Sequence, residues 1–115
     1  MIKGGTMQEL NDEKQYDDFL QGHPAAAIWF SAPDCNVCHV LLPKVAEMLQ
    51  QEFPCVALAK VDCAAAAVLA ASHNVLTIPT LLLAFDGHEA QRFVRNFGIG
   101  QVREALIRPY GLMFE

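Results

Sequence analysis

Stretches of apolar and polar residues alternate along the chain and divide it into strands and helices. Apolar residues dominate Ala25–Phe30, Cys55–Val61 and Leu81–Phe85, as is typical of strands that are buried on both faces. A fourth strand is expected over Gln91–Phe97, because Asp86-Gly87 is a turn signal that joins it to the third strand as a hairpin.

Helical spacing of apolar residues predicts helices before, between and after these strands. Gln15 is placed to complete a capping box from Asp12 in the first helix, and Pro43 should kink the second. The expected helices run from an Asn11 or Asp12 cap to a Gly22-His23-Pro24 stop, from Val37 to Phe53, from Ala64 to Ser72, and from Gly100 to Arg108. This order predicts an α/β fold with a mixed central sheet flanked by helices on both faces.

Length and composition limit the possible organisation. With 115 residues, 53% of them hydrophobic, the chain fits a single domain over residues 1–115. We expect residues 1–9 to be a loose N-terminus. Residues 109–115 form an unusually apolar C-terminal tail, which either folds back on the domain or associates with a partner or a second copy. The sequence does not decide between these alternatives.

Charge and leader composition exclude some partners. The net charge is −5 and no basic cluster is present, so a nucleic-acid partner is not expected. No apolar run is long enough for a bilayer, so no membrane partner is expected either. Because Met1–Thr6 lacks the apolar core of a signal peptide, we predict a cytoplasmic protein. In that compartment a cysteine pair is more often catalytic or metal-binding than structural.

Cys35-Asn36-Val37-Cys38 lies where the first buried strand meets the second helix. Two cysteines with this spacing can form and reopen a disulfide. The helix N-terminus favours the thiolate of Cys35, whereas the neighbouring Asp34 charge disfavours it. We therefore expect Cys35 to be the attacking thiolate and Cys38 the resolving thiol. The alternative is a purely structural role, as a pair of core thiols or an inert disulfide.

The cysteine motif also matches patterns for haem and metal binding. With His39 the motif also fits the haem-attachment pattern C-x-x-C-H, with Met48 or Met113 as a further ligand, but strand and helix leave no room for haem. A zinc site needs four ligands, and no second cysteine pair accompanies this one. We therefore expect no metal and no cofactor. Cys55 and Cys63 are expected to be buried core thiols, with Cys63 the more reactive.

A wider set of residues resembles the thioredoxin family over Leu10 to Ile107. The resemblance implies a thioredoxin fold and a cis peptide bond before Pro79, which lies against the cysteine pair. The residues that carry it are Phe30–Cys38, Pro43, Val61-Asp62, Val75–Thr80, Phe85-Asp86-Gly87 and Gly98.

The same resemblance implies a thiol–disulfide oxidoreductase that most simply reduces protein disulfides. Its partners would be a disulfide-containing protein and, as electron donor, a reductase or a small thiol. The substrate is expected to contact Ile78, Asp34, Asn36 and Val37. The rival hypothesis is a binding module or assembly chaperone in which the cysteines are vestigial or regulatory and the apolar tail is the partner surface.

Three departures separate this chain from the family pattern. Asp34 replaces the aromatic residue before the first cysteine, and Asn36-Val37 replaces Gly-Pro between the cysteines. Trp29 stands where many thioredoxins carry a buried acidic residue that exchanges protons with the second cysteine. Water or another group must then exchange that proton. We expect Trp29 to pack beneath the cysteine pair and to leave Cys38 in an apolar environment.

Overall fold

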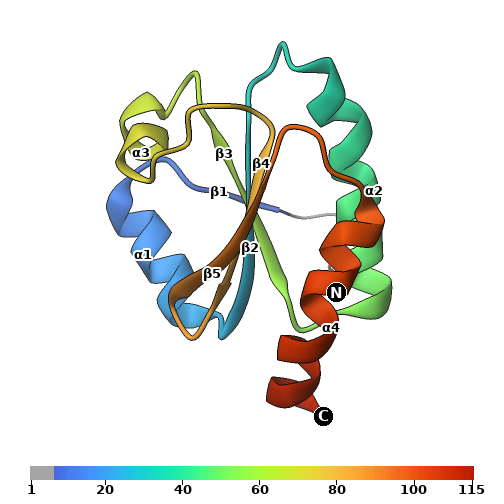
Figure 1. Ribbon diagram of the computed structural model, residues 1–115. Helices are drawn as coiled ribbons and strands as arrows, with labels where there is room; N and C mark the ends of the chain where they lie inside the picture. Colours follow the sequence, from blue (N-terminus) through green and yellow to red (C-terminus); the bar gives the residue numbers. More distant parts are fainter. Residues whose placement is uncertain (1–6) are drawn as a thin grey trace.

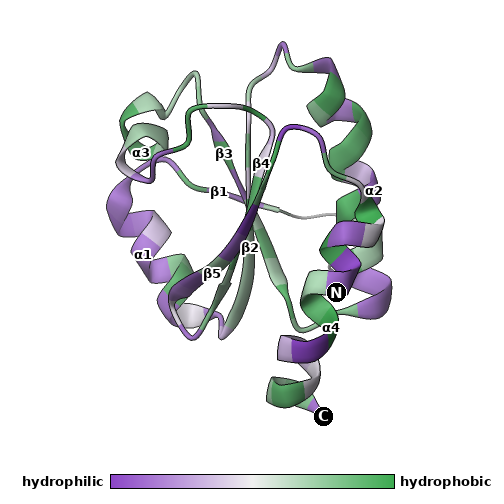
Figure 2. Cartoon of the chain, viewed as in Figure 1, coloured by the Kyte–Doolittle hydropathy of each residue, from purple (hydrophilic) through white to green (hydrophobic). Residues whose placement is uncertain are grey.

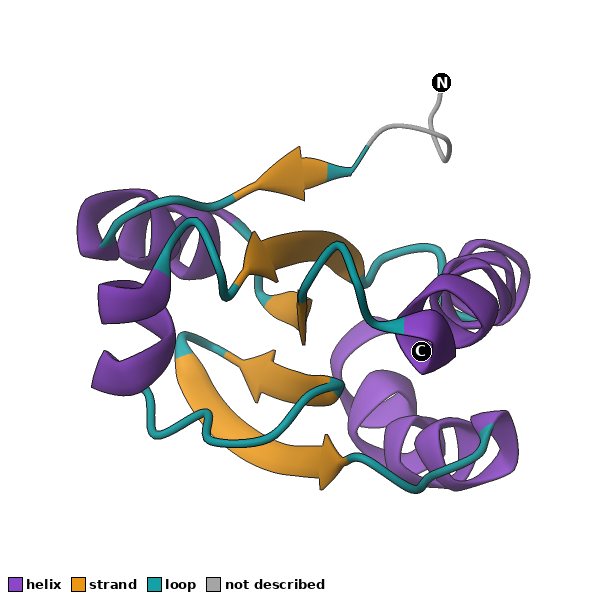
Figure 3. Ribbon diagram, turned by 90° about the horizontal axis from the view of Figure 1, so that it is seen from above, coloured by secondary structure: helices purple, strands orange, loops and turns teal. Residues whose placement is uncertain are grey.

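The structure, a computed structural model, describes residues 7–115 as a five-stranded sheet between two layers of helices (Figure 1). α2 and α4 cover one face and α1 and α3 the other, as the view along the layers also shows (Figure 3). The elements are β1 (Gln8–Glu9), α1 (Glu13–Gly22), β2 (Ala25–Ser31), α2 (Asn36–Glu52), β3 (Ala57–Asp62), α3 (Ala67–Ser72), β4 (Thr80–Phe85), β5 (His88–Val94) and α4 (Ile99–Phe114).

The sheet is mixed, as predicted, with the strand order β1-β3-β2-β4-β5. β2 pairs in parallel with β3 and antiparallel with β4, and β4 and β5 form the expected hairpin. In this register Phe30 lies opposite Thr80, which in turn lies opposite Val94. The ends of β2, β3 and β5 and the start of β4 therefore meet at one edge of the sheet.

The central strand β2 is buried on both faces, because its side chains alternate between two cores. Trp29 packs in the cluster beneath α2 and α4, whereas Ile28 and Phe30 pack in the cluster beneath α1 and α3. Edge strand β5 and much of α1 are hydrophilic in contrast (Figure 2). The layered core fixes the end of β2, and with it the loop that leads to Cys35.

The N-terminal elements begin close to where the sequence predicts. The side chain of Asp12 caps α1 by accepting a hydrogen bond of 2.9 Å from the Gln15 backbone N–H. The side chain of Gln15 accepts instead from the Asn11 backbone N–H, at 2.8 Å, so the reciprocal half of the expected box is displaced by one residue. Gln8–Glu9 form β1, so the expectation of a loose terminus through residue 9 is wrong for these two residues. Residues 1–6 of that expectation lie outside the described residues.

Other boundaries also differ from the expectation, and β5 begins at His88 rather than Gln91. β3 begins at Ala57 rather than Cys55. α3 begins at Ala67 rather than Ala64. The Asp62 carboxylate accepts hydrogen bonds from the backbone N–H groups of Ala64 and Ala65, which holds these residues in a turn before the helix. β5 ends at Val94 rather than Phe97, because Arg95 has a φ of +66° and breaks the extended backbone.

The last helix extends beyond the expected end at Arg108. α4 continues to Phe114, so the residues expected as an apolar tail are helical. The Tyr110 ring lies 5.1 Å from the ring of Phe53, and its hydroxyl accepts a hydrogen bond of 3.1 Å from the Cys55 backbone N–H. Phe114 also packs against the core, whereas Leu112 is 76% exposed. Folding back on the domain is thus what Tyr110 and Phe114 do.

Tyr110→Ala is expected to destabilise the fold by about 3 kcal/mol, because it removes a buried aromatic side chain and leaves a cavity. Leu112→Ala is the matched control on the same helix, and it should change the free energy of unfolding by no more than about 0.5 kcal/mol. Urea denaturation of both variants measures the difference. Equal destabilisation would show that the C-terminal turns of α4 do not pack as described.

Candidate active site

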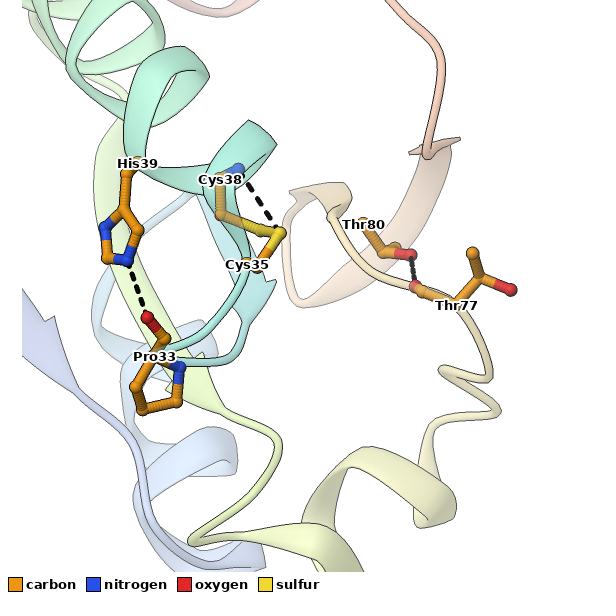
Figure 4. Close-up of a disulfide and its surroundings, with 6 residues drawn as sticks. All are labelled: Pro33, Cys35, Cys38, His39, Thr77 and Thr80. Atoms are coloured by element: carbon orange, nitrogen blue, oxygen red, sulfur yellow. Dashed lines mark hydrogen bonds between the residues drawn. A yellow bond between two sulfur atoms is a disulfide. The ribbon is translucent and has the colours of Figure 1, made fainter.

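Cys35 and Cys38 form a disulfide at the edge where the sheet meets the start of α2 (Figure 4). Their Cα atoms are 5.3 Å apart. β2 ends at Ser31, and the following loop turns tightly because the Cys35 backbone N–H donates to the Ala32 carbonyl at 3.1 Å. The C-x-x-C motif therefore occupies the predicted strand-to-helix junction.

The two cysteines have different environments. Cys35 is the N-cap of α2, is half-buried, and its Sγ accepts a hydrogen bond of 3.2 Å from the Cys38 backbone N–H. Cys38 lies inside the first turn and is only 3% exposed. A thiolate at Cys35 would be stabilised by the same N–H group and by the helix dipole. The arrangement thus gives the two sulfur atoms unequal access and unequal electrostatics.

His39 ties the first turn of α2 to the preceding loop. Its Nε2 lies 2.7 Å from the Pro33 carbonyl oxygen, so Nε2 carries the hydrogen in this contact. In Figure 4 the ring lies on the other side of the helix start from the two sulfur atoms. His39 therefore holds the loop in place.

The loop before β4 lies across from the disulfide (Figure 4). The Ile78–Pro79 peptide bond is cis, as the family resemblance implies. Pro79 is buried and Ile78 is half-buried. The Thr80 hydroxyl donates to the Thr77 carbonyl at 2.7 Å, and the Pro79 carbonyl accepts from the Arg95 backbone N–H at 2.7 Å. The start of β4 is thereby fixed to the end of β5 beside the cysteine pair.

Trp29 lies beneath the site in the same buried cluster as Cys38, and Cys35 packs against that cluster. Its side chain is fully buried, and its Nε1 has no hydrogen-bond partner among the described residues. An open pocket of about 350 Å³ reaches Trp29 and Cys38 and is also lined by Lys60 and Asp62. The apolar setting predicted for Cys38 is present, and the pocket wall adds polar groups near it.

Reduction of the disulfide is expected to change the tryptophan fluorescence, because a nearby disulfide quenches indole and Trp29 is the single tryptophan. Emission spectra of the oxidised and the reduced protein test this directly. The Cys35→Ser, Cys38→Ser double variant is the control and should not respond to reductant. An unchanged wild-type spectrum would mean that Trp29 does not lie beside the pair in solution.

The other two cysteines differ from the expectation. Cys55 is exposed and Cys63 is half-buried, so neither is a fully buried core thiol. Burial, and to a lesser degree the Asp62 charge, raise the pKa of the Cys63 thiol. A raised pKa lowers the thiolate fraction at neutral pH, which argues against the predicted higher reactivity of Cys63. Cys55 precedes the start of β3, at the end of the strand that lies away from the cysteine pair.

Residues 7–115 contain no group of three or more His, Cys, Asp or Glu side chains arranged to hold a metal ion. No helix within the same residues combines the length and apolar character needed to cross a membrane.

The structure brings together the residues expected at the site and adds others. Asp34 and Asn36-Val37 flank the sulfur atoms along the chain, and the Ile78–Pro79 loop lies across from them. Arg95 and Phe97 were missed because that segment was expected to continue β5. The clue in the sequence was the polar Arg95-Asn96 pair between two apolar residues, which is unsuited to a buried strand end.

Comparisons with known proteins agree with the geometry. The model of the thioredoxin family matches residues 6–106. The chain is 34% identical over 106 residues to the thioredoxin-like protein YdfQ of Bacillus subtilis, covering 92% of this chain and 94% of that protein. It is 36% identical over 88 residues to thioredoxin of Chlamydia trachomatis, covering 76% of this chain and 83% of that protein.

Solved structures of thioredoxins also match this chain over most of its length. The thioredoxin of Fasciola hepatica superposes with a TM-score of 0.77 at 30% identity, covering 89% of this chain and 98% of that chain. An N21Q mutant thioredoxin from Halobacterium salinarum gives a TM-score of 0.79 at 25% identity, covering 96% and 95% of the two chains. The chain belongs to the thioredoxin family, and both the predicted thioredoxin fold and the predicted thiol–disulfide oxidoreductase activity are confirmed.

Proposed function

We propose that this protein reduces disulfides of other proteins, with Cys35 as the attacking thiolate and Cys38 as the resolving thiol. The observation that carries this assignment is the contrast between the two sulfur atoms. Cys35 is accessible and accepts a helix N–H, whereas Cys38 is 3% exposed. The first attack needs an accessible thiolate, and the second step needs a thiol held close to the first sulfur.

The proposed reaction has two steps. The Cys35 thiolate attacks one sulfur of the substrate disulfide, forms a mixed disulfide, and releases the other substrate sulfur as a thiolate that takes up a proton. Cys38 then loses its proton and attacks Cys35, which breaks the mixed disulfide and releases the second substrate thiolate. Two electrons pass to the substrate, and the Cys35–Cys38 disulfide remains.

The substrate is proposed to contact Asp34, Asn36 and Val37 along the start of α2 and Ile78 across from it. All four side chains are exposed or half-exposed, which supports this role. Pro79 is proposed to shape the surface against which the substrate lies. Since its carbonyl accepts the Arg95 N–H at 2.7 Å, the Pro79 loop is held in a fixed position toward the disulfide.

The proton of Cys38 is proposed to pass to water in the pocket beneath the site. Trp29 has no carboxylate, so it cannot take up that proton. The pocket reaches Cys38 and carries Lys60 and Asp62 in its wall, which gives water a polar path to the thiol. Desolvation by Trp29 disfavours the Cys38 thiolate, and this should make the resolving step slow at neutral pH.

We further propose that the protein works in the cytoplasm and receives its electrons from a reductase or a small thiol. The free thiols Cys55 and Cys63 support this compartment, because unpaired cysteines are typical of reducing surroundings. An electron donor is needed because the Cys35–Cys38 disulfide must be reduced again after each turnover.

Insulin reduction tests the proposed function against the rival binding role. With dithiothreitol as electron source, the protein is expected to accelerate the precipitation of reduced insulin, and the Cys35→Ser, Cys38→Ser double variant is not. Turbidity against time measures both. If wild type and double variant gave the same rate, the cysteines would not reduce protein disulfides, and the binding module or assembly chaperone would be the better hypothesis.

A further inference from the structure

An open groove of about 430 Å³ lies beside the cysteine pair. The first turns of α2 form one wall, where Val37 and Val40 are 55% and 63% exposed. Residues 95–97, which follow β5, form the other wall. Asn36 and Val37, which stand between the two cysteines in the sequence, also line the groove, so the groove includes the segment that links Cys35 to Cys38. Val37 and Val40 lie three residues apart on α2 and together form an exposed apolar wall, which suits an apolar group of a bound chain.

Arg95 is held at this groove by its backbone. Its N–H donates to the Pro79 carbonyl at 2.7 Å, and the next N–H, of Asn96, donates to the Val94 carbonyl at 2.8 Å. The φ of +66° at Arg95 is uncommon for a residue with a long side chain, and such conformations cluster at functional sites. The turn therefore fixes a guanidinium-bearing residue in the groove wall, one hydrogen bond away from the loop that faces the disulfide.

The charge of Arg95 is not neutralised within residues 7–115. Its side chain is exposed and forms no ion pair there, whereas Arg92 is paired with Glu89 and Arg103 with Glu52. Asp34 carries the opposite charge, but it precedes Cys35 and does not line the groove. A substrate therefore meets an apolar wall and a cation on the Val37 side of the disulfide.

We infer that Arg95 is a specificity-determining residue that selects protein disulfides in which an apolar side chain and a carboxylate flank the attacked cysteine. The apolar side chain lies on Val37 and Val40, and the carboxylate pairs with Arg95. The inference rests on the proposed function, because the selected segment must reach the Cys35 thiolate. The chemistry is the two-electron exchange described above, and Arg95 affects only which disulfide is positioned for it.

The test uses three peptide disulfides that differ at one position beside a leucine near the cysteine: aspartate, asparagine or lysine. Single-turnover reduction by the prereduced protein is followed by chromatography. The second-order rate constant is expected to be about fivefold higher for the aspartate than for the lysine peptide, as for an exposed ion pair. This ratio should fall toward one near 1 M salt, where the Debye length is about 3 Å.

Arg95→Glu is expected to reverse the preference, and Arg95→Gly to remove it. Glycine fits the left-handed backbone at this position, so the second variant removes the cation without straining the turn. Arg108→Glu is the matched control, because it makes the same charge change on an exposed part of α4 outside the groove. It should leave the peptide preference unchanged.

The outcomes separate this inference from the proposed function. If wild type reduces all three peptides at equal rates, or if Arg95→Glu keeps the wild-type preference, the role of Arg95 is overturned while the reductase function stands. A preference that also reverses in Arg108→Glu would reflect net charge and overturn it too. If wild type reduces none of the peptides, including the neutral asparagine peptide, the proposed function itself fails.

Discussion

Cys38→Ser is expected to accumulate mixed disulfides with its protein substrates, whereas Cys35→Ser is expected to form none. The physical reason is the unequal placement of the two sulfur atoms. Cys35 caps α2 and is half-buried, so it can be both ionised and reached, whereas Cys38 is 3% exposed. Without Cys38 nothing displaces the substrate from Cys35, and turnover should be lost entirely after the first attack.

Nonreducing electrophoresis and mass spectrometry of the two variants, after mixing with a disulfide-containing protein, measure the trapped species. Alkylation of the reduced wild type at neutral pH provides an independent check, since Cys35 should be modified first. Cys55→Ser is a suitable control, because Cys55 lies away from the site and should not affect trapping. Equal trapping by both site variants, or by neither, would contradict the assigned order.

Trp29→Asp is expected to have two large and opposite effects. It should lower the free energy of unfolding by about 3–5 kcal/mol, because a fully buried aromatic side chain is lost and a carboxylate is buried in its place. It should also speed the resolving step at neutral pH, since the new carboxylate lies in the cluster that contains Cys38 and can take up its proton. Stability and rate would then change in opposite directions.

Trp29→Asn is the matched control, because asparagine has nearly the shape of aspartate but cannot take up the proton. Both variants should be destabilised in urea denaturation. Only the aspartate variant should show a faster second step in stopped-flow reduction of a mixed disulfide. The rate of that step should decrease when the pH is lowered below the pKa of the new carboxylate. The same rate and pH profile in both variants would mean that Cys38 does not exchange its proton at this position.

Local patterns along the chain were enough to predict much of the fold. The apolar run at β2 identifies a strand buried on both faces, and Asp12 and Asp86-Gly87 have the chemistry of a helix cap and a hairpin turn. The cis bond before Pro79 was implied by the family resemblance, because the residues around it match a known pattern. In these cases the local sequence and the tertiary structure favour the same conformation.

Other features depend on contacts that no local pattern contains. Pro109 and Gly111 suggest that the last helix ends near Arg108, yet α4 continues because Tyr110 packs on Phe53 and bonds to the Cys55 backbone. In the same way, β5 ends at Val94 because the Arg95 N–H bonds to the Pro79 carbonyl across the site.

The sequence by itself determined the α/β fold, the buried central strand and the cysteine pair at the start of a helix, because spacing and side-chain type decide these features locally. Only the tertiary structure decided how far α4 extends, where β5 ends, and that Arg95 lines a groove beside the start of α2. The physical reason is that burial and proximity are set by segments far apart in the chain. Trp29, Cys38, Pro79 and Arg95 come close together only when the sheet pairs β2 with β4 and β4 with β5.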